Sequence, residues 1–250
     1  MGKVILITGA TGIAEATALA AAAQGDSVFV VSRTEAHCRE LSARLPGSGF
    51  HACDLRDECA AAAAFEACLH KFGGVDAVFN VAGISGRRFG DGPLHECSAE
   101  GWDITLDTNV RSMFLMCRSA LRYWPDAGRH GTILNMASVL AFSPQAKHFA
   151  THAYAASKGA IISMSRAMAA YYALHKIRVN VIAPALVRTP MSARAQSDAA
   201  VLDFIARKQP LSDGMLDAGE VAKTALFLLG EESRHMTGQV IGVDGGWAVS

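Results

Sequence analysis

The sequence has no excess of charge of either sign, since 23 lysine and arginine residues balance 23 aspartate and glutamate residues. Proteins that bind nucleic acid or anionic membranes concentrate positive charge on one surface. No basic stripe runs along this chain, so we expect neither nucleic acid nor a membrane as a partner.

Long apolar runs are also absent, because no stretch reaches the roughly 18 apolar residues that span a bilayer. The first residues lead directly into a short apolar stretch, without the charged region and cleavage site of a secretory signal. We therefore expect a cytoplasmic protein.

Neither the cysteines nor the histidines form a disulfide or metal-binding pattern. The six cysteines include no CxxC pair and lack the density of a disulfide scaffold, so they are interpreted as reduced thiols. His148 and His152 have the spacing of a metal pair, but no third ligand follows at a suitable spacing. We predict no metal site and interpret the two histidines as candidates for substrate contact.

The chain has 250 residues, of which 51% are hydrophobic, and can bury the core of one α/β domain. No internal repeat and no Pro/Gly/Ser-rich linker divides it, which predicts a single domain over residues 1–250. Strands are predicted at residues 3–8, 27–32, 49–53, 76–80, 131–136, 177–183 and 239–243. Helices are predicted at residues 12–24, 34–45, 57–72, 99–124, 152–175 and 217–229. This alternation predicts a Rossmann-type doubly wound parallel sheet of about seven strands.

One long segment, residues 184–217, is predicted to be irregular. It carries scattered apolar residues, including Met191, Phe204 and Met215. Long loops in compact domains often close over a site, so we interpret this segment as a substrate lid.

The N-terminal stretch has the pattern of a strand, a glycine-bearing turn and a helix. Residues 4–7 are apolar, Gly9 and Gly12 lie in the turn, and an alanine-rich segment follows. Glycines let the backbone approach a pyrophosphate, and N–H groups at the start of the helix face its charge. Ligands of open parallel sheets bind beyond the carboxyl ends of the strands. One crevice is therefore expected to contain four residues at later strand ends: Ser32, Arg33, Asp54 and Asn80.

Tyr154 and Lys158 are four residues apart, which places both side chains on one face of a helix. A phenol with a pKa of about 10 is a poor acid at neutral pH, and a nearby ammonium lowers that value. The pair is therefore a candidate acid catalyst. The alternative is an ordinary tyrosine and lysine on an amphipathic helix.

Several further motifs occur in order along the chain. They are TGATGIA at residues 8–14, Asp54 with Leu55, NVAG at residues 80–83, Asn109 in WDITLDTNV, Ser138 in ILNMASV, PALVRTP at residues 184–190, and TGQVIGVDGGW at residues 237–247. With Tyr154 and Lys158, these motifs resemble the short-chain dehydrogenase/reductase family, in its single-domain branch similar to 3-oxoacyl-ACP reductases. The resemblance covers the whole chain.

The resemblance implies an oxidoreductase that transfers a hydride between a nicotinamide and a carbonyl or secondary alcohol. Tyr154 would be the general acid or base, and Ser138 would hydrogen-bond the substrate oxygen. Lys158 would lower the phenol pKa and hold the nicotinamide ribose, while Asn109 would position a water for proton return. The alternatives are a strand-end cap for Ser138 and an ordinary hydrogen-bonded helix position for Asn109.

The same resemblance implies a set of cofactor contacts: Gly9, Thr11, Gly12, Ile13, Ser32, Arg33, Asp54, Leu55, Asn80, Ala82, Gly83, Tyr154, Lys158, Pro184, Val187 and Thr189. A carboxylate after the second strand favours NAD, whereas Ser32 and Arg33 stand there and favour the 2′-phosphate of NADP. The alternative is a solvated Arg33 in an enzyme that accepts NAD as well. Asp54 would contact adenine, or alternatively cap the turn that follows it.

Three features depart from the family pattern. The glycine turn is one residue shorter than TGxxxGxG, and Ala14 replaces its last glycine. Ala185 stands where a glycine commonly follows Pro184, which predicts a shifted loop beside the nicotinamide. The spacing of 16 residues between Ser138 and Tyr154 is wider than usual, and the additional residues are expected beside the substrate.

The sequence leaves the substrate open, because an apolar lid discriminates poorly between molecules of similar size. Arg87 and Arg88 are interpreted as an exposed pair, with contact to an anionic substrate group as the alternative. A non-catalytic nucleotide sensor on the same fold is the alternative function. The resemblance also implies a homotetramer, paired through the helices at residues 99–124 and 152–175 and through the last strand.

Overall fold

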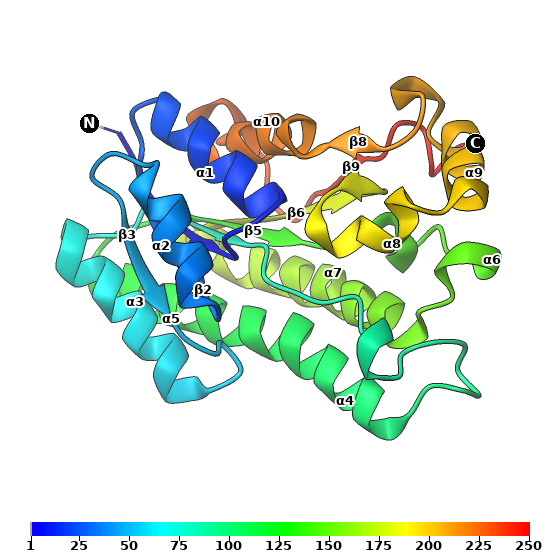
Figure 1. Ribbon diagram of the computed structural model, residues 1–250. Coiled ribbons are helices and arrows are strands. Elements are labelled where there is room, and N and C mark those ends of the chain that lie inside the picture. Colours follow the sequence, from blue (N-terminus) through cyan, green and yellow to red (C-terminus); the bar gives the residue numbers. More distant parts are fainter. Residues whose placement is uncertain (1) are drawn as a thin grey trace.

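Seven parallel strands form the central sheet of the computed structural model, which describes residues 2–250 (Figure 1). Across the sheet they are β3 (Gly49–Ala52), β2 (Ser27–Ser32), β1 (Val4–Thr8), β4 (Ala77–Asn80), β5 (Thr132–Met136), β6 (Arg178–Pro184) and β9 (Val240–Val243). The strand order reverses between β1 and β4, where an open sheet offers a crevice at its carboxyl edge. The predicted doubly wound sheet is confirmed, and the strand boundaries agree closely with the predicted ones.

Helices cover both faces of the sheet. One face carries α1 (Ile13–Ala23), α2 (Glu35–Ala43) and α10 (Ala218–Leu229), and the other carries α3 (Glu58–Phe72), α5 (Ser112–Asp126) and α7 (His152–Tyr172). A further helix, α4 (Ala99–Leu106), leads into α5 and lies beside α7.

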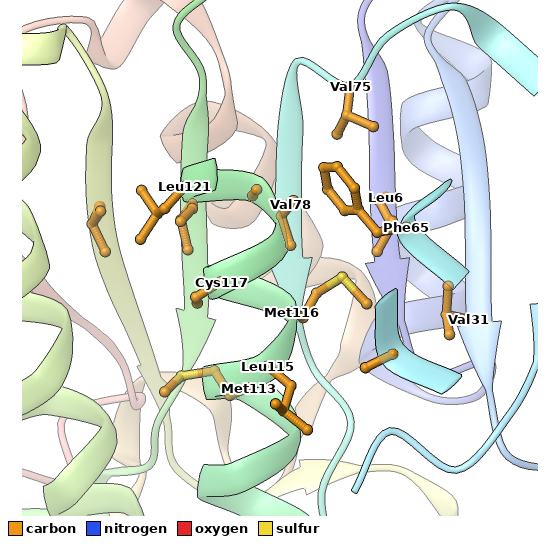
Figure 2. Close-up of a cluster of buried hydrophobic side chains, with 14 of the residues drawn as sticks. Leu6, Val31, Phe65, Val75, Val78, Met113, Leu115, Met116, Cys117 and Leu121 are labelled. Carbon is orange, nitrogen blue, oxygen red and sulfur yellow. The ribbon is translucent and has the colours of Figure 1, made fainter. Parts of the chain in front are cut away.

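Alternate side chains of each strand enter different apolar clusters. Leu6 packs toward α3 and α5, whereas its neighbours Ile5 and Ile7 pack toward α1 and α10. Figure 2 shows Leu6 and Val78 from the strands near Met116 of α5. Because both faces of the sheet are covered, the strand sequences are continuous apolar runs. Burial of each large apolar side chain contributes about 1.5–3 kcal/mol to the free energy of unfolding.

Local signals fix the ends of the helices. The carboxylate of Asp57 accepts the N–H of Ala60 and caps α3, and Gly73 ends that helix in a left-handed conformation. Between these caps lies a run of alanines, the residue with the highest helix propensity. Similar chemistry caps α4, where the Ser98 hydroxyl accepts the N–H of Gly101.

The structure differs from the prediction of one helix over residues 99–124. A π-helical turn, η2 (Asp107–Arg111), separates α4 from α5. Such turns insert a residue into a helix and occur frequently at functional sites. Its central residue is Asn109, whose side chain is bonded to neighbouring elements and not to solvent.

The prediction that residues 184–217 are irregular is wrong. This segment contains the strands β7 (Val187–Arg188) and β8 (Leu216–Asp217), which pair with each other, and the helices α8 (Ala193–Gln196) and α9 (Ala199–Lys208). The carboxylate of Asp198 accepts the N–H groups of Ala200 and Val201 and caps α9. The short 3₁₀ turns η5 (Pro190–Ser192) and η6 (Pro210–Ser212) complete it.

A third apolar cluster joins this segment to the C-terminus. Val201 and Ile205 of α9 pack with Trp247, which is only 1% exposed. The Trp247 ring contacts Phe149 and Phe204, and its indole N–H donates to the carbonyl of Ser143. The remaining short elements are η1 (Arg87–Phe89), η3 (Val139–Ala141), α6 (Ala146–Phe149), η4 (Ala173–His175) and η7 (Glu231–Ser233).

Candidate active site

A cavity of about 610 Å³ opens beyond the carboxyl ends of the strands. Its walls come from the glycine turn, the ends of β2 to β6, the start of α7 and the segment over residues 184–217. The cavity brings together nearly all of the predicted site residues: Gly9, Thr11, Gly12, Ile13, Ser32, Arg33, Asp54, Leu55, Ala82, Gly83, Ser138, Tyr154, Lys158, Pro184, Val187 and Thr189. Asn80 and Asn109 do not line it.

The shortened turn still directs the start of α1 into the cavity. Gly9 and Gly12 both have positive φ angles, of 97° and 61°. A Cβ atom on Gly12 would lie 2.9 Å from Cγ2 of Thr189, so only glycine allows this close approach to Thr189. Ala14 is 1% exposed and packs in the core. Free N–H groups at this helix start suit a phosphate, so the cradle fits a dinucleotide in spite of the missing residue.

The loop after β6 tolerates Ala185 in place of glycine. Ala185 does not have a positive φ angle, and its N–H donates to the carbonyl of Val243 at 3.2 Å. The alanine therefore introduces no strain at this position. In the longer stretch between Ser138 and Tyr154, Phe149 and Thr151 line the cavity, so part of the additional chain lies at the cavity wall.

Basic residues lie at the ends of β2 and β3. Arg33 is exposed, and no ion pair or hydrogen bond engages its side chain within residues 2–250. Asp54 is held by Arg56, whose Nε and Nη2 donate to its carboxylate at 3.0 and 2.6 Å. This pairing holds the pKa of Asp54 below its ordinary value. The Asp54 carboxylate also accepts the backbone N–H of Arg56, so it caps the turn while facing the cavity.

Ser138 and Tyr154 come together at the end of β5. The Ser138 hydroxyl accepts the N–H of Leu140 at 3.2 Å, as the alternative of a strand-end cap predicted. The same hydroxyl faces the Tyr154 phenol and acts to lower its pKa, against the larger effect of burial. Ser138 therefore both caps the turn and faces the phenol.

Lys158 is almost completely buried, at 3% exposed. Its ammonium donates to the carbonyl of Met136 at 2.8 Å and lies over the Tyr154 ring, 5.5 Å from the ring centre. Removal from water disfavours the charged ammonium, which lowers the pKa of Lys158 to about 8.

The expectation that Lys158 lowers the pKa of Tyr154 needs correction for the protein without ligands. Loss of water around the phenol raises the pKa of Tyr154 above its ordinary value, and only the Ser138 hydrogen bond acts in the opposite direction. The physical reason is that the ammonium bonds to a backbone carbonyl and faces the ring, not the phenol oxygen. Tyr154 is therefore a protonated hydroxyl donor at neutral pH.

Asn109 lies behind the cavity wall. Its amide donates to the carbonyl of Ile84 and to the hydroxyl of Ser157, and its oxygen accepts the N–H of Ile84. All of these partners are protein groups. The side chain of Asn109 is therefore hydrogen-bonded as in the alternative interpretation, an ordinary helix position, and not as in the interpretation that it positions a water. Since Ser157 precedes Lys158, these bonds connect η2 to the helix that carries the lysine.

Asn80 lies below the cavity, although it was predicted to contact the cofactor. Its amide donates to Asn135 and Cys117 in a buried polar network. The loop above it is held by Thr8, whose hydroxyl accepts the N–H groups of Val81 and Ala82. Asn80 therefore supports the sheet end, and the backbone of residues 81–83 forms the wall.

Asp91 is a functional candidate that no sequence motif indicated. It is 6% exposed, and its two carboxylate oxygens accept the N–H groups of Ala153 and Tyr154, each at 2.9 Å. Thr151, which precedes α7, makes no side-chain cap. Asp91 therefore caps the helix that carries Tyr154 from 62 positions away in the chain, a distance at which no local motif could identify it.

The two histidines are not at the cavity surface. Nδ1 of His152 accepts the N–H of Leu94, and the ring of His148 lies against Phe204. Within the described part of the chain, no three metal-ligating side chains gather into a possible metal centre. His152 thus contributes to the fold of the loop before α4. Neither histidine lines the cavity, and contact of these side chains with substrate stays a prediction.

Comparison with known proteins adds to this geometry. Residues 8–248 match the family model described as "Enoyl-(Acyl carrier protein) reductase". The chain is 32% identical to a (5R,7aS)-5-hydroxy-7a-methyl-1-oxo-2,3,5,6,7,7a-hexahydro-1H-indene-carboxyl-CoA reductase of Mycobacterium tuberculosis, over 97% of this chain and 92% of the relative. It is 33% identical to D-threitol dehydrogenase of Mycolicibacterium smegmatis, with 99% and 94% covered.

A solved structure is similar in fold as well. It is the 3-ketoacyl-(acyl-carrier-protein) reductase of Brucella melitensis complexed with NADH, with a TM-score of 0.89 and 31% sequence identity. The likeness covers 99% of each chain.

Removal of the Asp91 cap is expected to destabilise the start of α7. Asp91→Ala leaves two buried N–H groups without an acceptor, which should lower the free energy of unfolding by about 2–4 kcal/mol. Asp91→Asn retains one acceptor and should lose less. Urea denaturation measures the loss, with Asp57→Ala as a control that removes an exposed cap from α3. Unchanged stability of Asp91→Ala would contradict the assigned role.

Proposed function

This chain belongs to the short-chain dehydrogenase/reductase family, and we propose that it reduces a ketone with NADPH, using Tyr154 as the general acid. Membership of the family makes it an NAD(P)-dependent oxidoreductase that acts on a carbonyl or secondary alcohol. The observation that carries the proposal is the convergence of Ser138, Tyr154 and Lys158 on one cavity beside the glycine turn.

The side chains can carry out the proton chemistry of carbonyl reduction. When bound, the nicotinamide supplies the hydride. Ser138 and Tyr154 present two hydroxyl donors where negative charge develops on the substrate oxygen, and Tyr154 transfers its proton there. Lys158 supplies positive charge next to this pair and is placed to hold the nicotinamide ribose. In the oxidative direction Tyr154 accepts the proton.

NADP is proposed as the preferred cofactor, with NAD as an alternative. Arg33 lies at the end of β2 with its guanidinium free of protein partners among the described residues, and Ser32 and Thr34 beside it also line the cavity. A guanidinium recognises a phosphate by charge and by its planar arrangement of donors. Residues 32–34 at this strand end include no carboxylate that would repel a 2′-phosphate. Asp54, which follows the neighbouring strand β3, is paired with Arg56.

A homotetramer is proposed as the assembly. β9 is an edge strand whose outer side is not covered by another strand, and exposed edges favour pairing. On the helical side, Phe114 of α5 is 41% exposed, and Tyr171 at the end of α7 is 70% exposed. Other apolar residues of the same helices, including Met116 of α5 and Ile161 of α7, are buried in the core and do not add to this surface.

The remaining proposals concern partners and location. The partner is a small carbonyl or alcohol substrate, and the location is cytoplasmic. None of the helices in residues 2–250 combines the length and apolarity needed to cross a bilayer. Neither the site nor the comparisons favour the alternative of a non-catalytic nucleotide sensor.

Replacement of the acid tests the proposed reaction. Tyr154→Phe removes only the hydroxyl, so folding and NADPH binding should persist while turnover of a ketone panel falls about 100-fold or more. Absorbance of the reduced nicotinamide measures the rate. Tyr171→Phe on the exposed side of the same helix is the control. If the Tyr154 variant keeps more than about a tenth of the activity, another group is the acid.

The buried ammonium predicts a pH dependence. The pKa of Lys158 is lowered to about 8, so the side chain loses its charge as pH rises through that value. Above about pH 8, kcat/KM for NADPH should fall about tenfold per pH unit if the charged form is required. Lys158→Arg keeps its charge at high pH and should lose this decline. A flat wild-type profile between about pH 7 and 10 would show that the charge is not needed.

Arg33→Ala tests the cofactor preference. Loss of a charge-assisted bond to phosphate should weaken NADPH binding by about 1–3 kcal/mol and leave NADH binding nearly unchanged. Titration of cofactor fluorescence measures both dissociation constants. Arg39→Ala is a matched control, since Arg39 pairs with Glu35 and does not line the cavity. Equal weakening for both cofactors would contradict an NADP preference.

Light scattering tests the assembly. A tetramer gives about four times the chain mass, and Phe114→Lys should reduce it to about twice that mass by placing charge in the helical interface. Phe227→Lys on α10 is the control, because Phe227 is exposed to a similar degree on the other face. A wild-type mass near that of one chain would refute the proposed tetramer.

A further inference from the structure

Two arginines from distant elements meet at one oxygen above the cavity. Nη2 of Arg87, in η1, donates to the backbone carbonyl of His148 at 2.9 Å. Nη2 of Arg194, in α8, donates to the same oxygen at 3.2 Å. Both side chains line the cavity, and so does Arg88. The guanidinium groups of Arg87 and Arg194 therefore share one acceptor where η1, α6 and the lid come together.

This positive charge is poorly neutralised by the protein. Arg194 is near Asp198, but at 3.9 Å and with both side chains largely exposed. Within residues 2–250 no carboxylate forms an ion pair with Arg87 or Arg88. Asp91, whose charge acts on Arg87, already uses both oxygens to cap α7. Burial and the charge of Arg194 lower the pKa of Arg87, so the two guanidiniums oppose each other.

A carbonyl oxygen is a weak partner for two guanidinium groups. Charge-assisted hydrogen bonds to a carboxylate or phosphate are stronger than bonds to a neutral acceptor, and guanidinium geometry suits such oxyanions. An anion at this position would also remove the repulsion between the two cations. The arrangement therefore has the donors and the charge of an anion site, with a neutral group in the place of the anion.

Apolar side chains line the same cavity as this cluster and the catalytic residues. Phe149, which follows His148, lines the cavity and contacts Trp247. Tyr154 and Ser138 line the same cavity. A molecule with its carbonyl at Tyr154 would place an apolar middle against Phe149 and Trp247, and its far end near the arginines.

We propose that Arg87 and Arg194, assisted by Arg88, bind an oxyanion on the substrate, so that the enzyme acts on carbonyl compounds bearing a carboxylate or phosphate. This inference rests on the proposed function, because it takes the carbonyl to lie at Tyr154. The anion replaces the carbonyl of His148 as the common acceptor. Since Arg194 belongs to the lid and Arg87 to the loop after β4, substrate binding also connects the lid to the body of the protein.

Matched substrates and variants test this site. The substrates are a series of straight-chain oxo acids, their methyl esters, and a hydroxyketone with and without a phosphate ester. The variants are Arg87→Gln, Arg194→Gln and the double variant. Arg207→Gln is the control, because this lid arginine pairs with Asp203 and does not line the cavity. The measurements are kcat/KM with NADPH, the dissociation constant of NADPH, and calorimetric titration of the NADPH complex with glutarate and with inorganic phosphate.

The wild-type enzyme should favour at least one anionic substrate over its neutral partner by about tenfold or more. The double variant should lose about tenfold or more on that anionic substrate, and lose calorimetric binding of the matching anion, while the neutral partner changes by less than about twofold. The control variant should match the wild type. A preference for oxo acids identifies a carboxylate, and a preference for the phosphate ester identifies a phosphate.

Other outcomes overturn the inference. Equal rates with anionic and neutral partners in the wild type show that the arginines do not select substrate. Equal losses on both partners show that they only hold the lid against His148, and a weaker NADPH complex shows that they bind the cofactor. If no ketone is reduced, the proposed function fails. The glutarate and phosphate titrations then decide the anion site alone, and absence of binding by the wild type refutes it.

Discussion

Burial of the parallel sheet on both faces is the constraint on which the arrangement of the site depends. Neither apolar cluster has room for an unpaired charge along the strands, so the polar groups are placed at the carboxyl edge, where the loops leave the sheet. Thr8 illustrates the coupling, because its hydroxyl, 2% exposed at the end of β1, binds two N–H groups of the loop after β4. A residue at the end of β1 thus holds the loop after β4, which forms part of the cavity wall.

The same burial determines the charge states on α7. Lys158 reaches the cavity through the core and satisfies its ammonium with the carbonyl of Met136, yet desolvation still lowers its pKa to about 8. The Tyr154 phenolate is disfavoured for the same reason, which keeps the hydroxyl available as a donor. Two contacts fix this helix against the rest of the site. Asp91 caps its first turn, and Asn109 binds Ser157 one residue before the lysine.

Sequence patterns predicted those features of the fold and the site that depend on nearby residues in the chain. Strand boundaries follow from apolar runs, and the family motifs place sixteen of the predicted site residues on the cavity wall. Features that depend on contacts between residues far apart in the sequence could not be predicted from it. The direction of Asn80 is set by Asn135 and Cys117, and the cap of α7 comes from Asp91. The pKa of Tyr154 depends on its loss of water, which a spacing rule does not contain. Helix α9 had a local signal in Asp198, but its apolar face is defined by packing against distant residues, including Trp247 and Val139.

The net charge of the chain is zero, but its cavity carries an excess of positive charge. Five arginines line it: Arg33 and Arg56 lie beside β2 and β3, and Arg87, Arg88 and Arg194 lie in η1 and α8. Among residues 2–250, Asp54 is the only carboxylate in the lining, and it is paired with Arg56. Charges separated by more than about 10 Å are largely screened in salt solution, so acids elsewhere on the surface do not cancel this local excess. A cavity with low-dielectric walls concentrates the field of such charges and attracts anions from solution. Net charge therefore excludes a uniformly basic surface, but it does not exclude a site whose two ends both bind negatively charged groups.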